Sequence, residues 1–140
     1  MTDDIKKKID VVFIAGGKFH DIDFARLEIL KLLAEDDRMK VRVFEDYSNL
    51  HAIEKADFLI TYTCDVRPTL EQQRVLKDYV SSGNRWLALH GTNSILQFMS
   101  DGKVDSPRIA PVMMETLGSQ FIAHPPIEPY KVKVVQPDHP

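Results

Sequence analysis

A continuous apolar run near the start of the chain constrains the fold more than any other stretch. Residues 9–15 read IDVVFIA and lead directly into Gly16-Gly17. Many β-branched positions with almost no polar ones are typical of a strand buried on both faces of a parallel sheet. Three similar but shorter runs follow, at residues 41–44, 58–63 and 86–89. Helices are predicted between them, capped by Asp21 or Asp23, by Ser48 or Asn49, and by Thr69.

Strands that alternate with helices imply right-handed crossovers and a parallel sheet covered on both faces. We therefore expect an α/β fold, a three-layer α/β/α sandwich with a flavodoxin-like, mainly parallel sheet in the order 2-1-3-4. A chain of 140 residues supplies one core, so we expect a single domain over residues 1–140. After the fourth strand we expect an inserted loop at residues 100–111, a short helix at 112–117 and a strand at 130–135.

The composition favours a small-molecule partner. The net charge is −3, and no basic stripe points to nucleic acid. No apolar run approaches the roughly 20 residues that a membrane span needs, and the first residues lack a signal-peptide core. A single cysteine, Cys64, excludes an internal disulfide. We expect a cytoplasmic protein that binds neither nucleic acid nor membrane, and a homo-oligomer is left open.

The apolar run at residues 86–89 stops abruptly at His90-Gly91, and three polar residues, Thr92, Asn93 and Ser94, follow before apolar residues resume. This pattern predicts a strand, a sharp turn and a helix. In α/β proteins such a turn raises one side chain at the carboxyl edge of the sheet, where hydrolases carry a nucleophile. Here the raised residue is His90, which we predict to be functional.

Histidines recur at predicted strand ends and loops. Imidazole exchanges protons near neutral pH and also binds divalent metals, so both uses are considered for His20, His90 and His124. We assign catalysis to His90 and His20 with Asp21, which either orients the His20 ring or caps the following helix. A divalent metal, held by His20, His90 and His124, is the open cofactor. For His124 an alternative is a hydrogen bond to a loop carbonyl.

Further residues near the same edge are candidates for substrate binding. The predicted set is Gly16, Gly17, Tyr62, Thr63, Phe121 and His124. The two glycines either bind a sugar hydroxyl or anion through their amides or simply let the chain leave the strand without a clash. Tyr62 and Phe121 are suited to stack on a sugar ring. Cys64 either pairs with His90 as a thiolate or is inert packing, and Trp86 is expected to pack.

Several short motifs together resemble the trehalose-utilisation (ThuA-like) family, a branch of the class I glutamine-amidotransferase-like superfamily. The similarity runs from about Ile9 to the last residue, and it rests on the order and spacing of the motifs. The matching pieces are His20-Asp21, Leu70-Glu71-Gln72-Gln73, Tyr79-Val80-Ser81-Ser82-Gly83, Leu87-Ala88-Leu89-His90-Gly91, Leu117-Gly118-Ser119-Gln120-Phe121, His124-Pro125-Pro126, Val132 to Val135 and Asp138-His139-Pro140.

The resemblance implies a role in the metabolism of trehalose or modified disaccharides. It also implies that the chain is a fragment or a shortened member, with a domain that is incomplete at its C-terminus. Glutamine amidotransferases carry a cysteine at the turn that holds His90 here, so glutamine hydrolysis is not expected. We expect a sugar-modifying enzyme that uses histidine chemistry. The alternatives are a non-catalytic sugar- or protein-binding module on the same scaffold, and a hydrolase that depends on Cys64.

Overall fold

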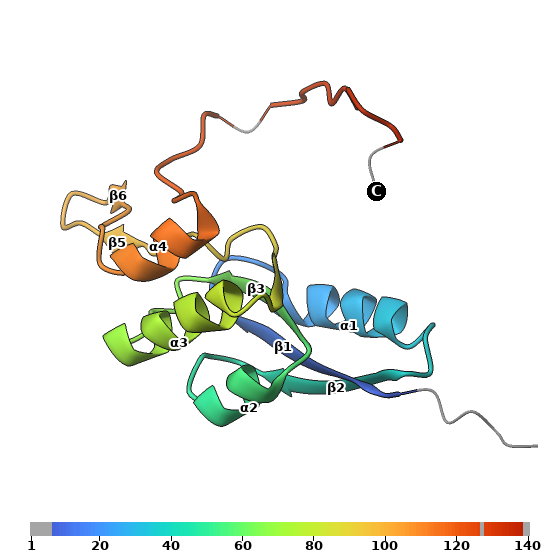
Figure 1. Cartoon of the computed structure of the whole chain (residues 1–140). Coiled ribbons are helices and arrows are strands. Elements are labelled where there is room, and N and C mark those ends of the chain that lie inside the picture. The colour runs from blue at the N-terminus through green and yellow to red at the C-terminus, as the bar shows by residue number, and fades with distance from the viewer. Residues whose placement is uncertain (1–6, 127, 139–140) are drawn as a thin grey trace, which may run out of the picture.

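The centre of the fold is a parallel sheet with its strands in the order β2-β1-β3-β4, as the sequence predicts. Figure 1 labels its first three strands, β1, β2 and β3. The computed structural model describes residues 7–126 and 128–138. The strands of this sheet are β1 (Ile9–Gly17), β2 (Met39–Phe44), β3 (Phe58–Cys64) and β4 (Arg85–Ala88). The helices are α1 (Ile22–Leu33), α2 (Leu50–Lys55), α3 (Leu70–Ser81) and α4 (Pro111–Leu117), and a small hairpin consists of β5 (Gln97–Phe98) and β6 (Val104–Asp105).

Strand β1 is buried because it has a parallel neighbour on each side and helices over both faces of the sheet. Val11 pairs with Val41 of β2 and with Phe58 of β3, and the register continues along both strands. Residues 11–15 are fully buried. The apolar run that begins the chain is therefore explained by burial on both faces of the sheet.

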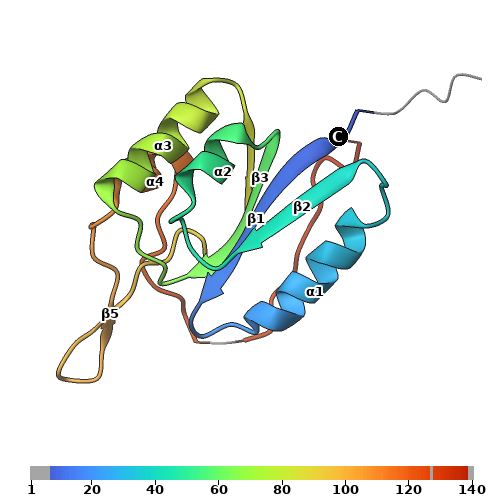
Figure 2. The ribbon, with the colours of Figure 1, turned by 90° about the horizontal axis from the view of Figure 1, so that it is seen from below.

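Helices cover both faces of the sheet, which confirms the predicted layers. Figure 2 shows α1 on one side and α2, α3 and α4 on the other. On the first side, Phe13 and Ile60 form a core with partly buried residues of α1 such as Leu30. On the second side, Ile14 and Leu76 belong to a larger core. The alternation of side chains along each strand supplies both cores.

The helix starts follow from their capping residues. The side chain of Asp21 accepts a hydrogen bond from the Phe24 amide, and Asn49 caps α2 in the same way. Helix α3 begins with a full capping box between Thr69 and Gln72, as its sequence predicts. Each such cap stabilises a helix start by about 1 kcal/mol. Of the two cap residues predicted for α1 and for α2, Asp21 and Asn49 are the ones that form the caps.

The helix expected after His90 is not formed. Residues 90–93 make a turn, and the chain then continues into β5. The backbone of residues 94–96 is hydrogen-bonded to Asp65, which follows β3, and therefore does not form a helix. The Asp65 amide donates to the Ser94 carbonyl at 2.8 Å, and the Leu96 amide donates to the Asp65 carboxylate at 3.0 Å. Ile95 between them is buried. These contacts replace the hydrogen bonds of a helix.

The last part of the chain also differs from the expectation. The loop expected at residues 100–111 contains β6, whereas the short helix is confirmed as α4. The strand expected at residues 130–135 is absent from the described part of the chain, although Tyr130, Val132 and Val134 alternate with lysines there. A strand needs a hydrogen-bonded neighbour, and no described strand pairs with this segment. His139 and Pro140 lie outside the described residues.

Strand β4 is an edge strand, and its hydrogen-bonded neighbour among the described strands is β3. Trp86 on β4 is half-buried, packs against the larger core and donates from Nε1 to the Thr61 hydroxyl at 2.9 Å. Across the described residues, no helix is both long and apolar enough to cross a membrane.

Candidate functional site

Two of the predicted histidines lie together at the carboxyl edge of the sheet. The ring centroids of His20 and His90 are 5.1 Å apart, and their planes are nearly perpendicular. Tyr62 approaches the His20 ring edge-on, with centroids 5.9 Å apart. His20 is half-buried and His90 is exposed. The three rings come from the ends of three different strands, β1, β3 and β4, so the parallel topology itself assembles them.

His20 reaches this position because the chain leaves β1 without side chains in the way. A Cβ on Gly16 would lie 2.0 Å from the Glu45 carbonyl oxygen, and one on Gly17 would lie 1.9 Å from that of Cys64. Gly17 also has a φ of 108°, which side chains disfavour. Close backbone packing therefore explains both glycines. Their predicted role in substrate binding stays a prediction.

His90 is held by the turn that follows β4. The Leu89 amide donates to the Thr61 carbonyl at 2.9 Å, and the Thr92 amide donates back to the Leu89 carbonyl at 3.1 Å. Thr92 is buried, and its hydroxyl lies 3.0 Å from that of Thr61. These bonds fix the turn to β3 and leave the imidazole of His90 projecting from the edge.

A buried carboxylate ties together the segments that carry the two histidines. Asp65, with its side chain only 2% exposed, is ion-paired with Lys18 at 2.9 Å and with Arg67 at 3.3 Å. Arg67 also donates to the Leu96 carbonyl. Burial raises the pKa of Asp65, but the hydrogen bonds from Lys18, the Leu96 amide and Arg67 outweigh it and hold the pKa below its usual value.

Sequence reasoning missed Asp65 for a clear reason. Its partner Lys18 is 47 residues away, and a lone aspartate after a strand is a common turn residue. One local signal exists in the structure, because Asp65 has a positive φ of 57°. That signal cannot be read from a single sequence.

The other predicted catalytic and binding residues are placed differently. Asp21 caps α1, and its carboxylate accepts from the Phe24 amide at 2.9 Å, so the capping interpretation is confirmed. The Nδ1 of His20 instead lies 3.3 Å from the Lys18 carbonyl oxygen. Thr63 is buried, and its hydroxyl is hydrogen-bonded to that of Tyr47 at 3.2 Å. Its side chain therefore belongs to the core beneath the site.

Phe121 and His124 lie on the segment after α4. The Phe121 amide donates to the Asn93 carbonyl at 3.1 Å, which brings this residue to the turn that follows His90. The His124 ring is exposed, lies 6.2 Å from the Phe121 ring, and its Nδ1 is 2.8 Å from the Pro125 carbonyl oxygen. Within the described residues His124 has no ring contact with His20 or His90.

A pocket of about 240 Å³ adjoins His90. It is lined by Ala88 at the end of β4, by residues 89–93, by Leu117 at the end of α4 and by Ser119 just after it. Asn93 donates from its side-chain amide to the Ser119 hydroxyl at 3.0 Å, which joins two of the lining residues. This pocket therefore surrounds the imidazole of His90 with polar backbone and side-chain groups, and among the described residues His20 and Tyr62 are not part of its lining.

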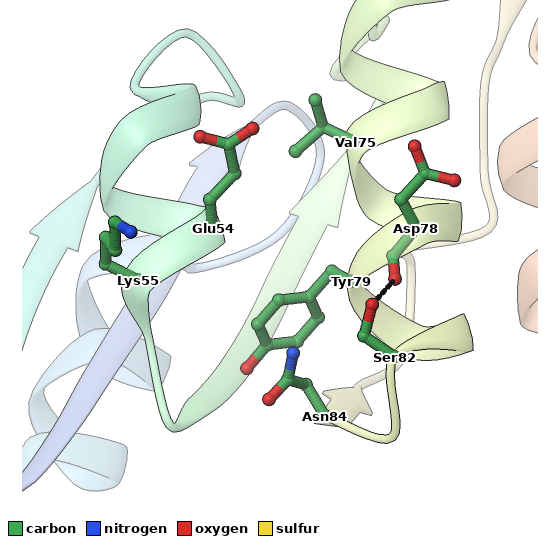
Figure 3. A pocket seen from close by; sticks show the side chains of 7 residues that line it. All are labelled: Glu54, Lys55, Val75, Asp78, Tyr79, Ser82 and Asn84. Carbon is green, nitrogen blue, oxygen red and sulfur yellow. Dashed lines mark hydrogen bonds between the residues drawn. The ribbon is translucent and has the colours of Figure 1, made fainter.

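A larger pocket of about 410 Å³ lies elsewhere, between the C-terminal ends of α2 and α3 (Figure 3). Its polar residues include Glu54 and Asp78, and it contains no histidine. Tyr79 in its wall donates to the Ala56 carbonyl at 3.2 Å, and burial raises the pKa of Tyr79 to about 12. The tyrosine thus closes a helix–strand junction, and this pocket lacks the chemistry of the histidine pair.

Cys64 is buried beside the site, with 2% of its surface exposed. Burial raises the pKa of its thiol, the neighbouring Asp65 raises it further, and Lys18 opposes them. This environment favours the neutral thiol, which is a poor nucleophile. Over the described ranges, no group of three or more histidine, cysteine, aspartate or glutamate side chains is arranged to hold a metal ion.

Comparison of the chain with protein-family models, with curated proteins and with solved structures finds no match.

Proposed function

We propose that the protein binds a sugar at the carboxyl edge of its sheet and acts on it through His20 and His90. The observation that carries this proposal is the 5.1 Å approach of two imidazoles from separate strands, with Tyr62 beside them. In open α/β sheets this edge is where ligands bind. The similarity of the sequence to the ThuA-like family supports a sugar as the ligand, in particular a disaccharide.

The chemistry would be general acid–base catalysis on sugar hydroxyls. An imidazole can both accept and donate a proton near neutral pH, so one ring can act as base while its neighbour acts as acid. The exposed ring of His90 is open to a ligand, whereas His20 is fixed by its contacts with Tyr62 and His90. A proton that leaves one sugar hydroxyl would pass to His90, and His20 would act as the acid that donates a proton to a second oxygen of the ligand.

A divalent metal is the alternative use of the same rings. Catalytic zinc sites take three protein ligands and leave one position open. His20 and His90 supply two nitrogen ligands, and His124 has no ring contact with either histidine within the described residues. The arrangement of donors therefore favours acid–base chemistry over a metal centre.

One observation favours the second candidate, a binding module without catalysis. Among the described residues no carboxylate is hydrogen-bonded to either imidazole, since Asp21 caps α1 and His20 Nδ1 faces the Lys18 carbonyl. Histidine bases in enzymes are often oriented by a third group of this kind. A histidine pair without one can still bind hydroxyls.

The test compares His90→Gln with His51→Gln, because His51 is an exposed histidine on α2 far along the chain from the site. Both variants should fold. If the protein is an enzyme, His90→Gln should lower turnover of a disaccharide by roughly 10²- to 10⁴-fold, and His51→Gln should not. A binding module would show weaker binding of trehalose by calorimetry in His90→Gln and no turnover in the wild type. The proposal would be rejected if His90→Gln bound trehalose as tightly as the wild type does and if sugar addition did not shift the imidazole NMR signals of the wild type.

A further inference from the structure

We propose that Phe19 and Phe98 form a second subsite beside the histidines, which takes the flat apolar face of a ring joined to the bound sugar. The two phenyl rings contact each other with centroids 5.4 Å apart and planes inclined by 45°. They are 61% and 57% exposed. This inference rests on the proposed sugar site and adds to it the class of group that the ligand carries.

Both rings of this pair are largely exposed although they contact each other. Large apolar side chains that touch each other and leave more than half of their surface in water mark binding sites more often than isolated exposed residues do. Met99 and Val104 on the same hairpin are also exposed, and Val104 is the cross-strand partner of Phe98. The apolar surface therefore continues from the loop after β1 onto β5 and β6.

The backbone of Phe19 has an unusual conformation. Its φ is 66°, in the left-handed region that a bulky residue rarely adopts. Its neighbour Lys18 is held in place, because its amide donates to the Cys64 carbonyl at 2.9 Å and its side chain is paired with Asp65. Strained residues of this kind concentrate at functional sites. In this backbone conformation Phe19 is 61% exposed.

The aromatic pair lies on the same two chain segments as the histidine pair. Phe19 directly precedes His20 in the chain, and Phe98 lies on β5, which follows the His90 turn. The same two segments therefore carry both the polar pair and the aromatic pair. Sites for small ligands combine apolar and aromatic surface with a few polar groups in this way. A sugar ring at the histidines would carry its next ring onto the phenyl groups.

The second ring can be an aryl group or another pyranose, since both present a flat face of carbon and hydrogen. The probes are methyl α-glucoside, phenyl α-glucoside and trehalose, each titrated by NMR and calorimetry. Phenyl α-glucoside or trehalose should bind about tenfold more tightly than methyl α-glucoside. A gain for the phenyl compound alone identifies an aryl ring, and a gain for trehalose alone identifies a second sugar.

The variants are Phe98→Ala and Phe19→Gly, with Phe24→Ala as the matched control. Phe24 is a 62% exposed phenylalanine on α1 that is not part of the pair. Phe98→Ala should remove the tenfold gain and leave methyl α-glucoside binding unchanged, and Phe24→Ala should change neither. Phe19→Gly should also lose the gain while its melting temperature rises, because glycine relieves the positive φ. A merely structural role for Phe19 would lower the melting temperature instead.

The two proposals fail in different readouts. The inference is overturned if Phe98→Ala and Phe19→Gly bind phenyl α-glucoside and trehalose as the wild type does. It is also overturned if the pair joins two copies of the chain, so that Phe98→Ala converts a wild-type dimer to a monomer in sedimentation. The proposed function is overturned if no probe shifts the His20 and His90 imidazole signals, whatever the aromatic variants do.

Discussion

The His20 ring lies against the backbone of Gly91, in the space that a side chain would fill. A Cβ at Gly91 would be 3.4 Å from His20 Cε1 and only 2.7 Å from the Thr63 carbonyl oxygen. The φ of Gly91 is 88°. The segments that carry His20 and His90 thus pack together through a glycine, and this contact sets the distance between the two imidazoles.

We predict that Gly91→Ala disturbs both the fold and the histidine pair. The matched control is Gly102→Ala, because Gly102 has a φ of 81° but open space around it. Both variants gain backbone strain of about 1–2 kcal/mol. Gly91→Ala should lose about a further 1–3 kcal/mol from overpacking against Thr63, measured by urea denaturation. Nuclear Overhauser contacts between the two imidazoles should weaken only in Gly91→Ala, and equal effects in both variants would contradict the packing argument.

The core hydroxyl pair gives a second prediction. Tyr47 is fully buried, and its hydroxyl is hydrogen-bonded to that of Thr63. Burial raises the pKa of Tyr47, and the bond to Thr63 opposes this. Tyr47→Phe leaves the buried Thr63 hydroxyl without that partner, so the free energy of unfolding should fall by about 1–3 kcal/mol. Adding Thr63→Val removes both polar groups and should recover part of the loss, and a purely additive double variant would contradict coupling between them.

The fold was largely predictable because its signals are local. The run at residues 9–15, the capping box at Thr69 and the cap at Asp21 each depend on a few neighbouring residues, and the structure confirms the elements that they predict. The segment after β4 was predicted wrongly because a contact with a distant residue, Asp65, decides it. Residues 130–135 have the alternation of a strand, but none of the described strands pairs with them.

The candidate site was predictable only in part. Parallel strands bring their carboxyl ends to one edge, so the meeting of His20 with the His90 turn follows from the predicted topology. Whether Thr63 faces the edge or the core depends on the alternation of side chains along β3. In the structure its hydroxyl faces the core and is hydrogen-bonded to that of Tyr47. No pattern in the sequence indicates that Phe19 is exposed, and its positive φ is visible only in the structure.

Cys64 should behave as a buried and neutral thiol. We predict that an aromatic disulfide reagent reacts with it slowly at pH 8 in the folded protein and rapidly in urea, because the folded pKa is raised by burial and by Asp65. The unfolded thiol ionises at about pH 8.5, so stability should decline as the pH rises above that value. Cys64→Ser should lack the part of this decline that begins near pH 8.5, whereas the part due to the buried Tyr47 and Tyr79 begins at about pH 10, where unfolded tyrosine ionises, and should remain. Fast labelling of the folded protein would instead support a reactive thiol.

The buried carboxylate of Asp65 gives the last prediction. Asp65→Asn keeps the size of the side chain and tolerates the positive φ, but it loses the charge that Lys18 and Arg67 face. Both cations are about half exposed or more, so solvent screening reduces the loss. The free energy of unfolding at pH 7 should fall by about 1–2 kcal/mol.

The pH dependence of this loss follows from the lowered pKa of Asp65. The unfolded carboxyl takes up a proton at about pH 3.9, whereas the folded one does so only at lower pH. The stabilising contribution is therefore complete above about pH 4 and is lost as the pH falls through the folded pKa. The difference between wild type and Asp65→Asn, measured by urea denaturation, should shrink from pH 6 to below pH 4. Asp101→Asn, which breaks an exposed pair with Lys103, should cost little at any pH, and a difference for Asp65→Asn that does not depend on pH would show that its charge is not the stabilising group.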